Sequence, residues 1–251
     1  MGDIGMQNED ENPTSPLDRG GFETTKWTLV EAAGHATDKR ARMAVEELCK
    51  TYWYPLYAHV RRRGHTKEDA EDLTQAFFAK FLEKNYLEGL TPERGRFRAF
   101  MLASLKNFLA NEWDKTQSQK RGGGQEILSL DWQDADMRYR IDPVDKLSPD
   151  KLYDRIWALT LLARVVEKLE ALYVGNDSFE KLKPCLTADR ASVNYADVAN
   201  ELGMSEGAVR VAAHRLRRQY REFLRAEIAE TLVDTNLVED ELNALFRAFA
   251  E

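Results

Sequence analysis

Cysteine and long apolar runs are both scarce in this sequence of 251 residues, and each scarcity argues against a class of protein. The two cysteines, Cys49 and Cys185, fit no metal-binding spacing, so we expect both to be reduced thiols in the core. No apolar run approaches the roughly 20 residues that a helix needs to cross a bilayer, and the first residues lack the pattern of a signal peptide. We therefore expect a cytoplasmic protein that neither inserts into membranes nor carries a metal or another cofactor.

The charge of the chain is unevenly distributed. Residues 1–25 carry −5 and residues 226–251 carry −6, so residues 26–225 together carry +4 although the whole chain carries −7. Because the acidity is concentrated in the two tails, an acidic protein can still present a local basic surface to nucleic acid. The first tail is also rich in Gly, Asn, Asp and Pro, which is typical of a disordered segment.

Apolar residues of the first half recur at helical spacing. They predict one helix over 44–56, which Pro55 is expected to kink or end, and a third helix from about 97 to 117. The segment HTKEDAEDLTQAFFAKFLEK (65–84) predicts the second helix, with Thr66 as its cap. The residues expected on its buried stripe are Ala70, Leu73, Phe77 and Phe81. No alternating strand pattern of useful length occurs, so the fold class predicted is all-α.

A cluster of helix breakers, KRGGG (120–124), and the polar segment after it separate this half from further helices that begin near 151. We therefore predict two helical modules joined by a linker. The predicted segments are a disordered acidic tail 1–25, a first module 26–120, a linker 121–150, a second module 151–225 and an acidic helical extension 226–251. The extension is expected either to cover the core of the second module or to compete for its basic residues.

The second module contains two short predicted helices around a glycine. In NYADVANELGMSEGAVRVAAHRLRRQYREFL, Asn194 is placed to cap the first helix, Gly203 to end it and Ser205 to cap the second. Cations recur on one predicted face of the second helix, at Arg210, His214, Arg217, Arg221 and Arg225. This arrangement is typical of a helix–turn–helix that reads DNA, since arginine bonds guanine edges and phosphates. The alternative is an ordinary solvated face.

Two segments resemble a known family. GAVRVAAHRLRRQYREFL resembles the final helix–turn–helix of bacterial extracytoplasmic-function sigma factors, and AEDLTQAFFAKFLEK is similar to the helix by which that family docks on core RNA polymerase. The likeness follows the family's order across 27–117 and 151–225, and the flanks resemble a subgroup with extended tails. It implies a sigma factor that directs promoter-specific transcription initiation. Such a protein has core RNA polymerase and promoter DNA as partners and no enzymatic activity of its own.

The candidate site residues form three groups. The basic helix and its cap would bind the duplex of the upstream promoter element through Ser205, Arg210, His214, Arg215, Arg217 and Arg218. Residues 91–124 carry +4 with interleaved aromatics, which suits single-stranded DNA. The resemblance implies that the melted downstream element is held there by Arg96, Arg98, Lys106, Asn107, Trp113 and Lys115. It likewise implies polymerase contacts at Asp72 and Gln75. The apolar residues Phe97, Phe100, Leu105 and Phe108 are expected in the core.

The sequence also departs from the family. Ala208 and the pair Val211–Ala212 stand where the family commonly has threonine and serine–arginine, and Asn111 replaces an aspartate. The promoter sequence therefore does not follow from the resemblance. Two other functions stay open, namely a helix–turn–helix regulator that binds operators without polymerase and a helical adaptor protein. An anti-sigma protein or a regulatory kinase is a further candidate partner.

Overall fold

A computed structural model of the chain describes six ranges of residues: 39–82, 96–116, 138–139, 147–173, 178–187 and 193–250. The predicted tail 1–25 and most of the predicted linker 121–150 lie outside the described residues. Within the described ranges every regular element is helical apart from one isolated bridge, so the all-α prediction is confirmed. None of the described helices is both long and apolar enough to span a membrane.

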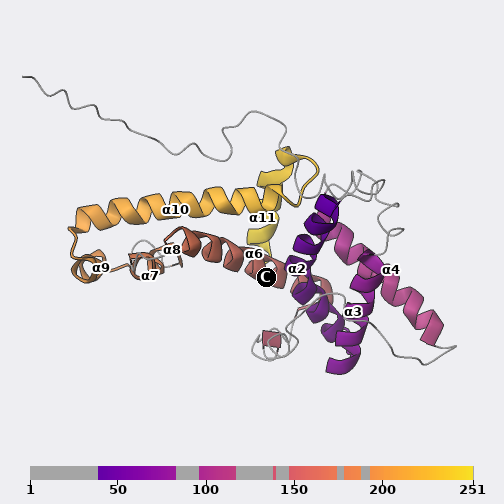
Figure 1. Ribbon diagram of the computed structural model, residues 1–251. Coiled ribbons are helices and arrows are strands. Elements are labelled where there is room, and N and C mark those ends of the chain that lie inside the picture. Colours follow the sequence, from indigo (N-terminus) through magenta and orange to yellow (C-terminus); the bar gives the residue numbers. More distant parts are fainter. Residues whose placement is uncertain are drawn as a thin grey trace, which may run out of the picture.

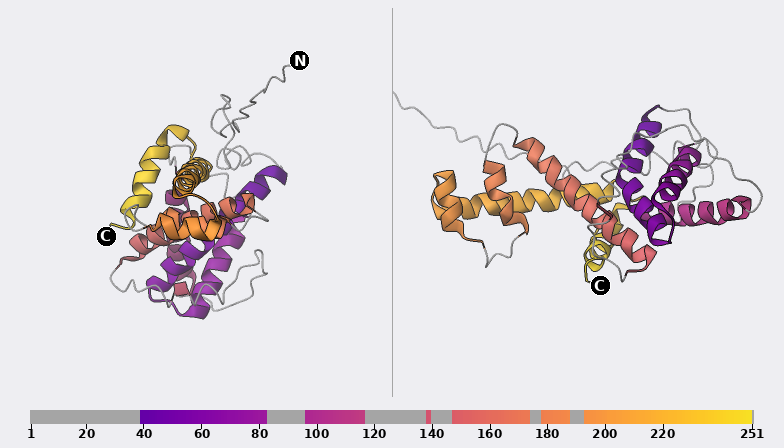
Figure 2. Two further views of the ribbon diagram at one scale, coloured as in Figure 1. Left: turned by 90° about the vertical axis from the view of Figure 1, so that its left-hand side faces the viewer. Right: turned by 90° about the horizontal axis from the view of Figure 1, so that it is seen from below.

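Two long helices connect the two ends of the molecule (Figure 1). The elements are α2 (Lys39–Arg62), α3 (Lys67–Leu82), α4 (Phe97–Thr116), α6 (Pro149–Leu172), α7 (Ser178–Leu182), α8 (Pro184–Thr187), α9 (Tyr195–Leu202), α10 (Glu206–Ala229), η2 (Thr235–Leu237) and α11 (Val238–Arg247). Helices α2, α3 and α4 gather at one end and α7, α8 and α9 at the other, while α6 and α10 reach from one end to the other (Figures 1 and 2).

The first core lies where α6 crosses α2. Trp157 of α6 is fully buried, and its indole Nε1 donates a hydrogen bond to the hydroxyl of Tyr52 at 3.2 Å. The Tyr52 ring in turn meets Phe97 of α4 edge-on, with 5.0 Å between the ring centroids. The end of α10 and helix α11 close this core through Leu224, Ile228 and other apolar side chains. Residues of the predicted second module 151–225 thus take part in the first core.

The sequence pattern located this core well. The predicted core residues of α4 are all buried, and so are Ala70, Phe77 and Phe81 of α3, with Leu73 half-buried. From the sequence, Pro55 is expected to kink the helix or to end it. It does not end the helix, because α2 continues through Pro55 to Arg62. Proline inside a helix costs about 3 kcal/mol, but Leu56 and its apolar neighbours in α2 are fully buried. Their burial offsets that cost.

A second, smaller core lies at the other end of the molecule. It joins the end of α6 to α7, α8, α9 and the first half of α10. Its fully buried residues include Cys185, Val209 and Leu216. Cys185 and Cys49 are both buried free thiols, as predicted, and burial raises the pKa of each. Helix α6 therefore contributes to both cores, with Trp157 in the first and Leu169 in the second.

The C-terminal extension forms a helix on the first core. Leu242 and Leu245 of α11 are buried there, and α11 packs on α6 and α10, so the extension covers residues of the predicted second module at the first core and not at the second. The reason is the length of α10, since its 24 residues span about 36 Å at 1.5 Å per residue and its last turns end in the first core. Phe246 of α11, in contrast, is 59% exposed.

A buried histidine makes the stability of the first core depend on pH. His59 of α2 is 1% exposed, and its Nδ1 lies 3.7 Å from an oxygen of Asp150. Burial lowers the pKa of His59, and the nearby Asp150 carboxylate opposes this without outweighing it. The unfolded chain takes up this proton near pH 6.5, and the folded chain takes it up only at lower pH. Stability therefore falls as the pH decreases below about 6.5.

We expect the free energy of unfolding in urea to decrease between about pH 7 and pH 5.5, and to decrease less steeply in His59→Gln, which cannot titrate. The exposed His214→Gln serves as the control and should keep the slope of the unchanged protein. Equal slopes for His59→Gln and the unchanged protein would contradict this account.

Candidate nucleic-acid interface

Helices α9 and α10 meet at a short turn whose three predicted signals are all present. The Asn194 side chain accepts a hydrogen bond from the amide of Ala196 at 3.2 Å, which caps α9. Gly203 ends α9 with φ 64°, in the left-handed region that favours glycine. The Ser205 hydroxyl accepts from the amide of Ala208 at 3.2 Å and caps α10. The local backbone of this turn is therefore determined by short-range contacts.

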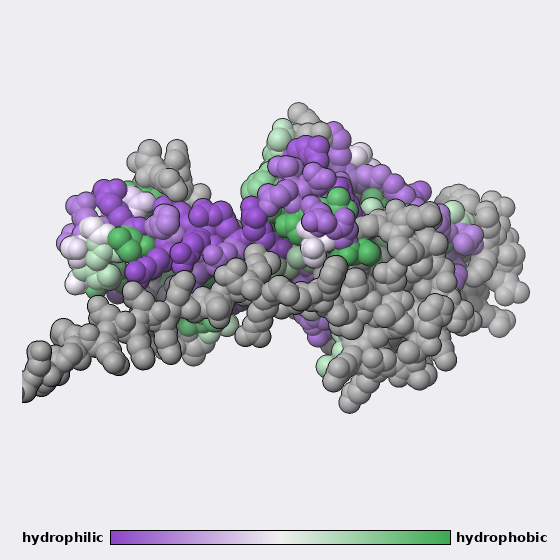
Figure 3. Space-filling view, turned by 90° about the horizontal axis from the view of Figure 1, so that it is seen from above, coloured by the Kyte–Doolittle hydropathy of each residue, from purple (hydrophilic) through white to green (hydrophobic). Residues whose placement is uncertain are grey.

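Helix α10 buries one face and exposes a series of cations. Val209, Ala213 and Leu216 lie fully buried in the second core. We define the basic strip as the exposed basic residues of α10, which are Arg210, His214, Arg215, Arg218, Arg221 and Arg225. Seen from the α10 side, the surface between the two ends of the molecule is mostly hydrophilic (Figure 3). The strip faces outward along one long rigid element.

Arg210 and Arg217 occupy different environments although the sequence predicts both on one basic face. The guanidinium of Arg210 lies 4.4 Å from the centroid of the Tyr195 ring and its side chain remains 60% exposed. Arg217 instead donates from Nε to the carbonyl of Cys185 at 2.8 Å and from Nη1 to the hydroxyl of Tyr195 at 3.3 Å. Arg217 therefore joins α10 to α8 and α9, and the predicted face is interrupted there. The sequence spacing predicts the side of α10 from which the Arg217 side chain extends, but it does not predict that α8 and α9 pack beside that side.

The other cations of the basic strip differ in their partners. Arg218 lies 3.7 Å from Glu222 on the same helix, a pair of exposed groups that contributes little to stability. Arg225 lies 2.7 Å from Glu239, so an acid of the C-terminal extension reaches one end of the strip. His214, Arg215 and Arg221 form no ion pair with another residue that the structure describes.

Three of the cations predicted to bind the downstream element have side chains that the structure describes, and each of the three has a carboxylate partner. Arg98 of α4 donates from Nε to Glu241 of α11 at 2.9 Å and also pairs with Asp154 of α6. Arg96 Nη1 lies 3.3 Å from the other oxygen of Glu241. Lys106 pairs with Asp150 at the start of α6. These carboxylates come from elements distant in sequence, and the sequence analysis assigned none of them a role.

The Arg98 cluster is electrostatically well satisfied. The side chain of Arg98 is 13% exposed and that of Glu241 is 1% exposed. Burial tends to lower the pKa of Arg98, but Glu241 and Asp154 raise it above its usual value. Burial raises the pKa of Asp154, against the effect of Arg98. The guanidinium also lies 4.5 Å from the centroid of the Trp157 ring, a cation–π contact that ties the cluster to the first core.

A signal for Glu241 does exist in the sequence. It precedes buried Leu245 by four residues, so a carboxylate stands on the apolar stripe of α11. A buried carboxylate requires a cationic or hydrogen-bonding partner, and its position on the stripe could have prompted a search for one.

The remaining predicted residues are only partly described. Asn107 of α4 is exposed, whereas the side chains of Trp113 and Lys115 lie outside what the structure describes. On α3, Asp72 is exposed and Gln75 is half-buried. Among the residues that the structure describes, no group of three or more His, Cys, Asp or Glu side chains is placed to hold a metal ion.

No protein-family model, curated protein or solved structure matches the chain. The resemblance to sigma factors thus stays a prediction from the sequence segments. The functional argument depends on the geometry of the basic strip and of the Arg98 cluster.

The two neighbouring arginines Arg217 and Arg218 should differ in their effect on stability. We expect Arg217→Ala to lower the free energy of unfolding by about 1–3 kcal/mol, because the Cys185 carbonyl and the Tyr195 hydroxyl lose their donor. Arg218→Ala, at an exposed position, should change it by no more than about 0.5 kcal/mol. Urea unfolding measures both, and equal losses would contradict the bracing role of Arg217.

Proposed function

We propose that this protein is a sigma factor that binds core RNA polymerase and directs promoter-specific transcription initiation in the cytoplasm. The observation that carries the proposal is the pair α9–α10, capped at both starts and stopped by Gly203, with exposed cations along α10. In a helix–turn–helix the first helix braces the second, whose first turns enter the major groove of DNA. On this proposal α9 supports α10, and the basic strip meets the duplex of the upstream element.

The first turns of α10 offer groups suited to both base edges and phosphates. Arg210 can bond a guanine edge while the Tyr195 ring limits the movement of its guanidinium. Val211 is 53% exposed and Met204 42% exposed, and such apolar groups can contact thymine methyls. Arg215 and Arg218 lie further along the exposed side of α10 and suit phosphates. Arg217 supports this surface from within and does not itself contact DNA.

Two further surfaces complete the proposal. Asp72 is exposed on α3, a helix that packs on α2 and α4, and it would contact polymerase together with Gln75. The first half of α4 and the residue before it would hold the melted downstream strand through Arg96, Arg98 and Lys106. Polymerase supplies the chemistry of transcription, so the proposed role requires no catalytic group in this chain. An anti-sigma protein or a kinase would act on these same surfaces.

The decisive experiment mixes the purified chain with core RNA polymerase and then adds a pool of genomic promoter fragments. A sigma factor co-elutes with polymerase and starts transcription from a subset of promoters. A regulator of the helix–turn–helix class binds DNA without polymerase, and an adaptor protein does neither. Either of the last two results would overturn the proposal.

A substitution on the basic strip should weaken recognition of the duplex. We expect Arg210→Ala to reduce affinity for a selected promoter duplex by a factor corresponding to about 1–3 kcal/mol, because one bidentate base contact is lost. Arg247→Ala, which removes an exposed cation from α11, is the matched control and should leave duplex affinity unchanged. Equal effects of the two variants in fluorescence anisotropy would argue against base reading by Arg210.

A substitution on α3 should separate polymerase binding from DNA binding. Asp72→Arg reverses the charge of one exposed side chain, so we expect the fold and the duplex affinity to be kept while co-elution with core polymerase is lost. Glu68→Arg, also exposed on α3, is the control for a general charge effect. Retained co-elution of Asp72→Arg would exclude this residue from the docking surface.

A further inference from the structure

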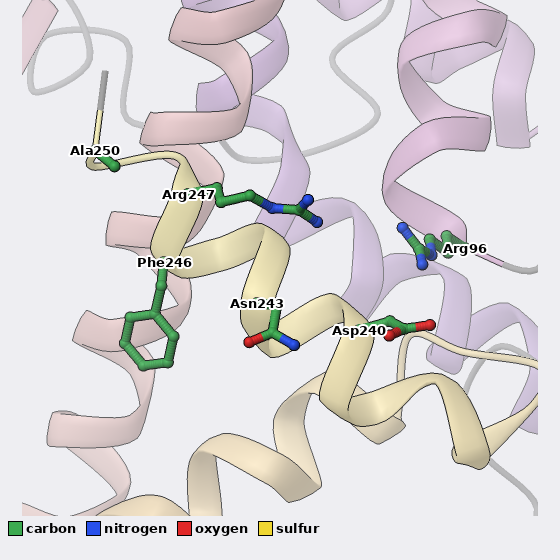
Figure 4. A pocket seen from close by; sticks show the side chains of 6 residues that line it. All are labelled: Arg96, Asp240, Asn243, Phe246, Arg247 and Ala250. Atoms are coloured by element: carbon green, nitrogen blue, oxygen red, sulfur yellow. The ribbon is translucent and has the colours of Figure 1, made fainter.

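A carboxylate of the C-terminal helix α11 is paired with the two arginines at the start of α4. The two oxygens of Glu241 divide between them, with Oε1 2.9 Å from Arg98 Nε and Oε2 3.3 Å from Arg96 Nη1. The close-up shows Arg96 directed toward α11, and Asp240 lies on the side of α11 that faces Arg96 (Figure 4). A guanidinium binds a carboxylate and a phosphate with the same fork of donors. Glu241 therefore uses donors of Arg96 and Arg98 that would equally suit a phosphate.

We propose that α11 is an autoinhibitory element, and that Glu241 must leave Arg96 and Arg98 before these residues can hold the backbone of a single strand. The inference rests on the proposed function and adds its regulation. One expectation from the sequence is that the acidic extension competes for the basic residues of α10, but its buried acid Glu241 meets the start of α4. Glu239 of the extension pairs with the basic strip, at Arg225.

Steric exclusion supports the competition. The side chain of Arg98 is 13% exposed, and its donors are taken by Glu241 and Asp154. A phosphate cannot reach these donors while the carboxylate of Glu241 is in place, and it would be repelled by the acid if it came near. Displacement exchanges one anion for another, so the charge of Arg98 is not left unpaired in the DNA-bound state.

Helix α11 can detach from the first core at low cost, because it is short and has few buried side chains. The helix has ten residues, too few to be stable alone in water, so it depends on its contacts with the first core. Those contacts include the buried Leu242 and Leu245, the partly buried Val238 and the pair with Arg98. The chain before it is joined to α4 by an amide hydrogen bond from Phe97 to the carbonyl of Thr231 at 3.1 Å. Short segments with few buried side chains open at lower cost than the core around them.

A purely structural role for Glu241 makes a different prediction. If the acid only anchors the extension, its removal loosens α11 and brings no gain in DNA binding. If it competes, its removal raises affinity for single strands. The affinity of a folded variant therefore separates the two roles.

The test uses the full chain and a fluorescent single-stranded DNA of mixed sequence and about 15 nucleotides. Glu241→Gln keeps the shape of the side chain and removes its charge, and we expect it to bind this strand about tenfold more tightly than the unchanged protein. The control is Glu239→Gln, which removes the same charge from α11 but frees Arg225 of the basic strip and neither Arg96 nor Arg98. We expect a clearly smaller gain from it than from Glu241→Gln. Adding Arg96→Gln to Glu241→Gln should reduce the gain.

Equal affinity of Glu241→Gln and the unchanged protein would overturn the inference and leave the proposed function standing. Binding of the strand by none of the proteins would overturn the proposed single-strand surface itself. Hydrogen exchange of the unchanged protein avoids any dependence on the folding of a variant. Saturating amounts of the same strand should speed amide exchange in residues 238–247, and unchanged exchange there in the presence of bound strand would also overturn the inference.

Discussion

The burial of Trp157 of α6 against α2 and α4 is the contact on which the rest of the structure depends. Its indole N–H bonds the Tyr52 hydroxyl of α2, and its ring lies under the guanidinium of Arg98 at the start of α4. Because α6 carries Trp157, this contact sets how the second half of the chain lies on the first. The position of Arg98, and with it the position of Glu241, follows from that packing.

Helix α10 transmits this arrangement to the other end of the molecule. Its first half covers the second core, and its last turns enter the first core through Leu224 and Ile228. The basic strip extends along most of the helix, from Arg210 to Arg225. Arg164 of α6 strengthens the join, with Glu47 of α2 at 2.9 Å and Glu227 of α10 at 3.5 Å. The hydrogen bond from Arg164 lowers the pKa of Glu47. A surface that reads DNA would therefore be held in a defined relation to the first core.

The distribution of charge has a different meaning in three dimensions than along the chain. Residues 26–225 carry +4, yet Arg96, Arg98 and Lys106 are all paired with acids. Most cations of α10, in contrast, point outward. The described conformation thus offers one basic surface openly and holds the other against the chain's own carboxylates. On the proposed function, a protein with this arrangement would meet duplex before it meets a melted strand.

The sequence by itself determined the features that depend on neighbours a few residues apart. Thr66, Asn194, Gly203 and Ser205 end or begin helices through contacts within five residues, and the apolar stripes of α3 and α4 follow from helical spacing alone. The separation of the exposed Arg210 from the bracing Arg217 and the sharing of α6 between two cores were decided only by the tertiary structure. So was the pairing of Arg98 with Glu241, which are 143 residues apart. Periodicity gives the direction of a side chain on its own helix, whereas the partner that it meets depends on how distant helices pack.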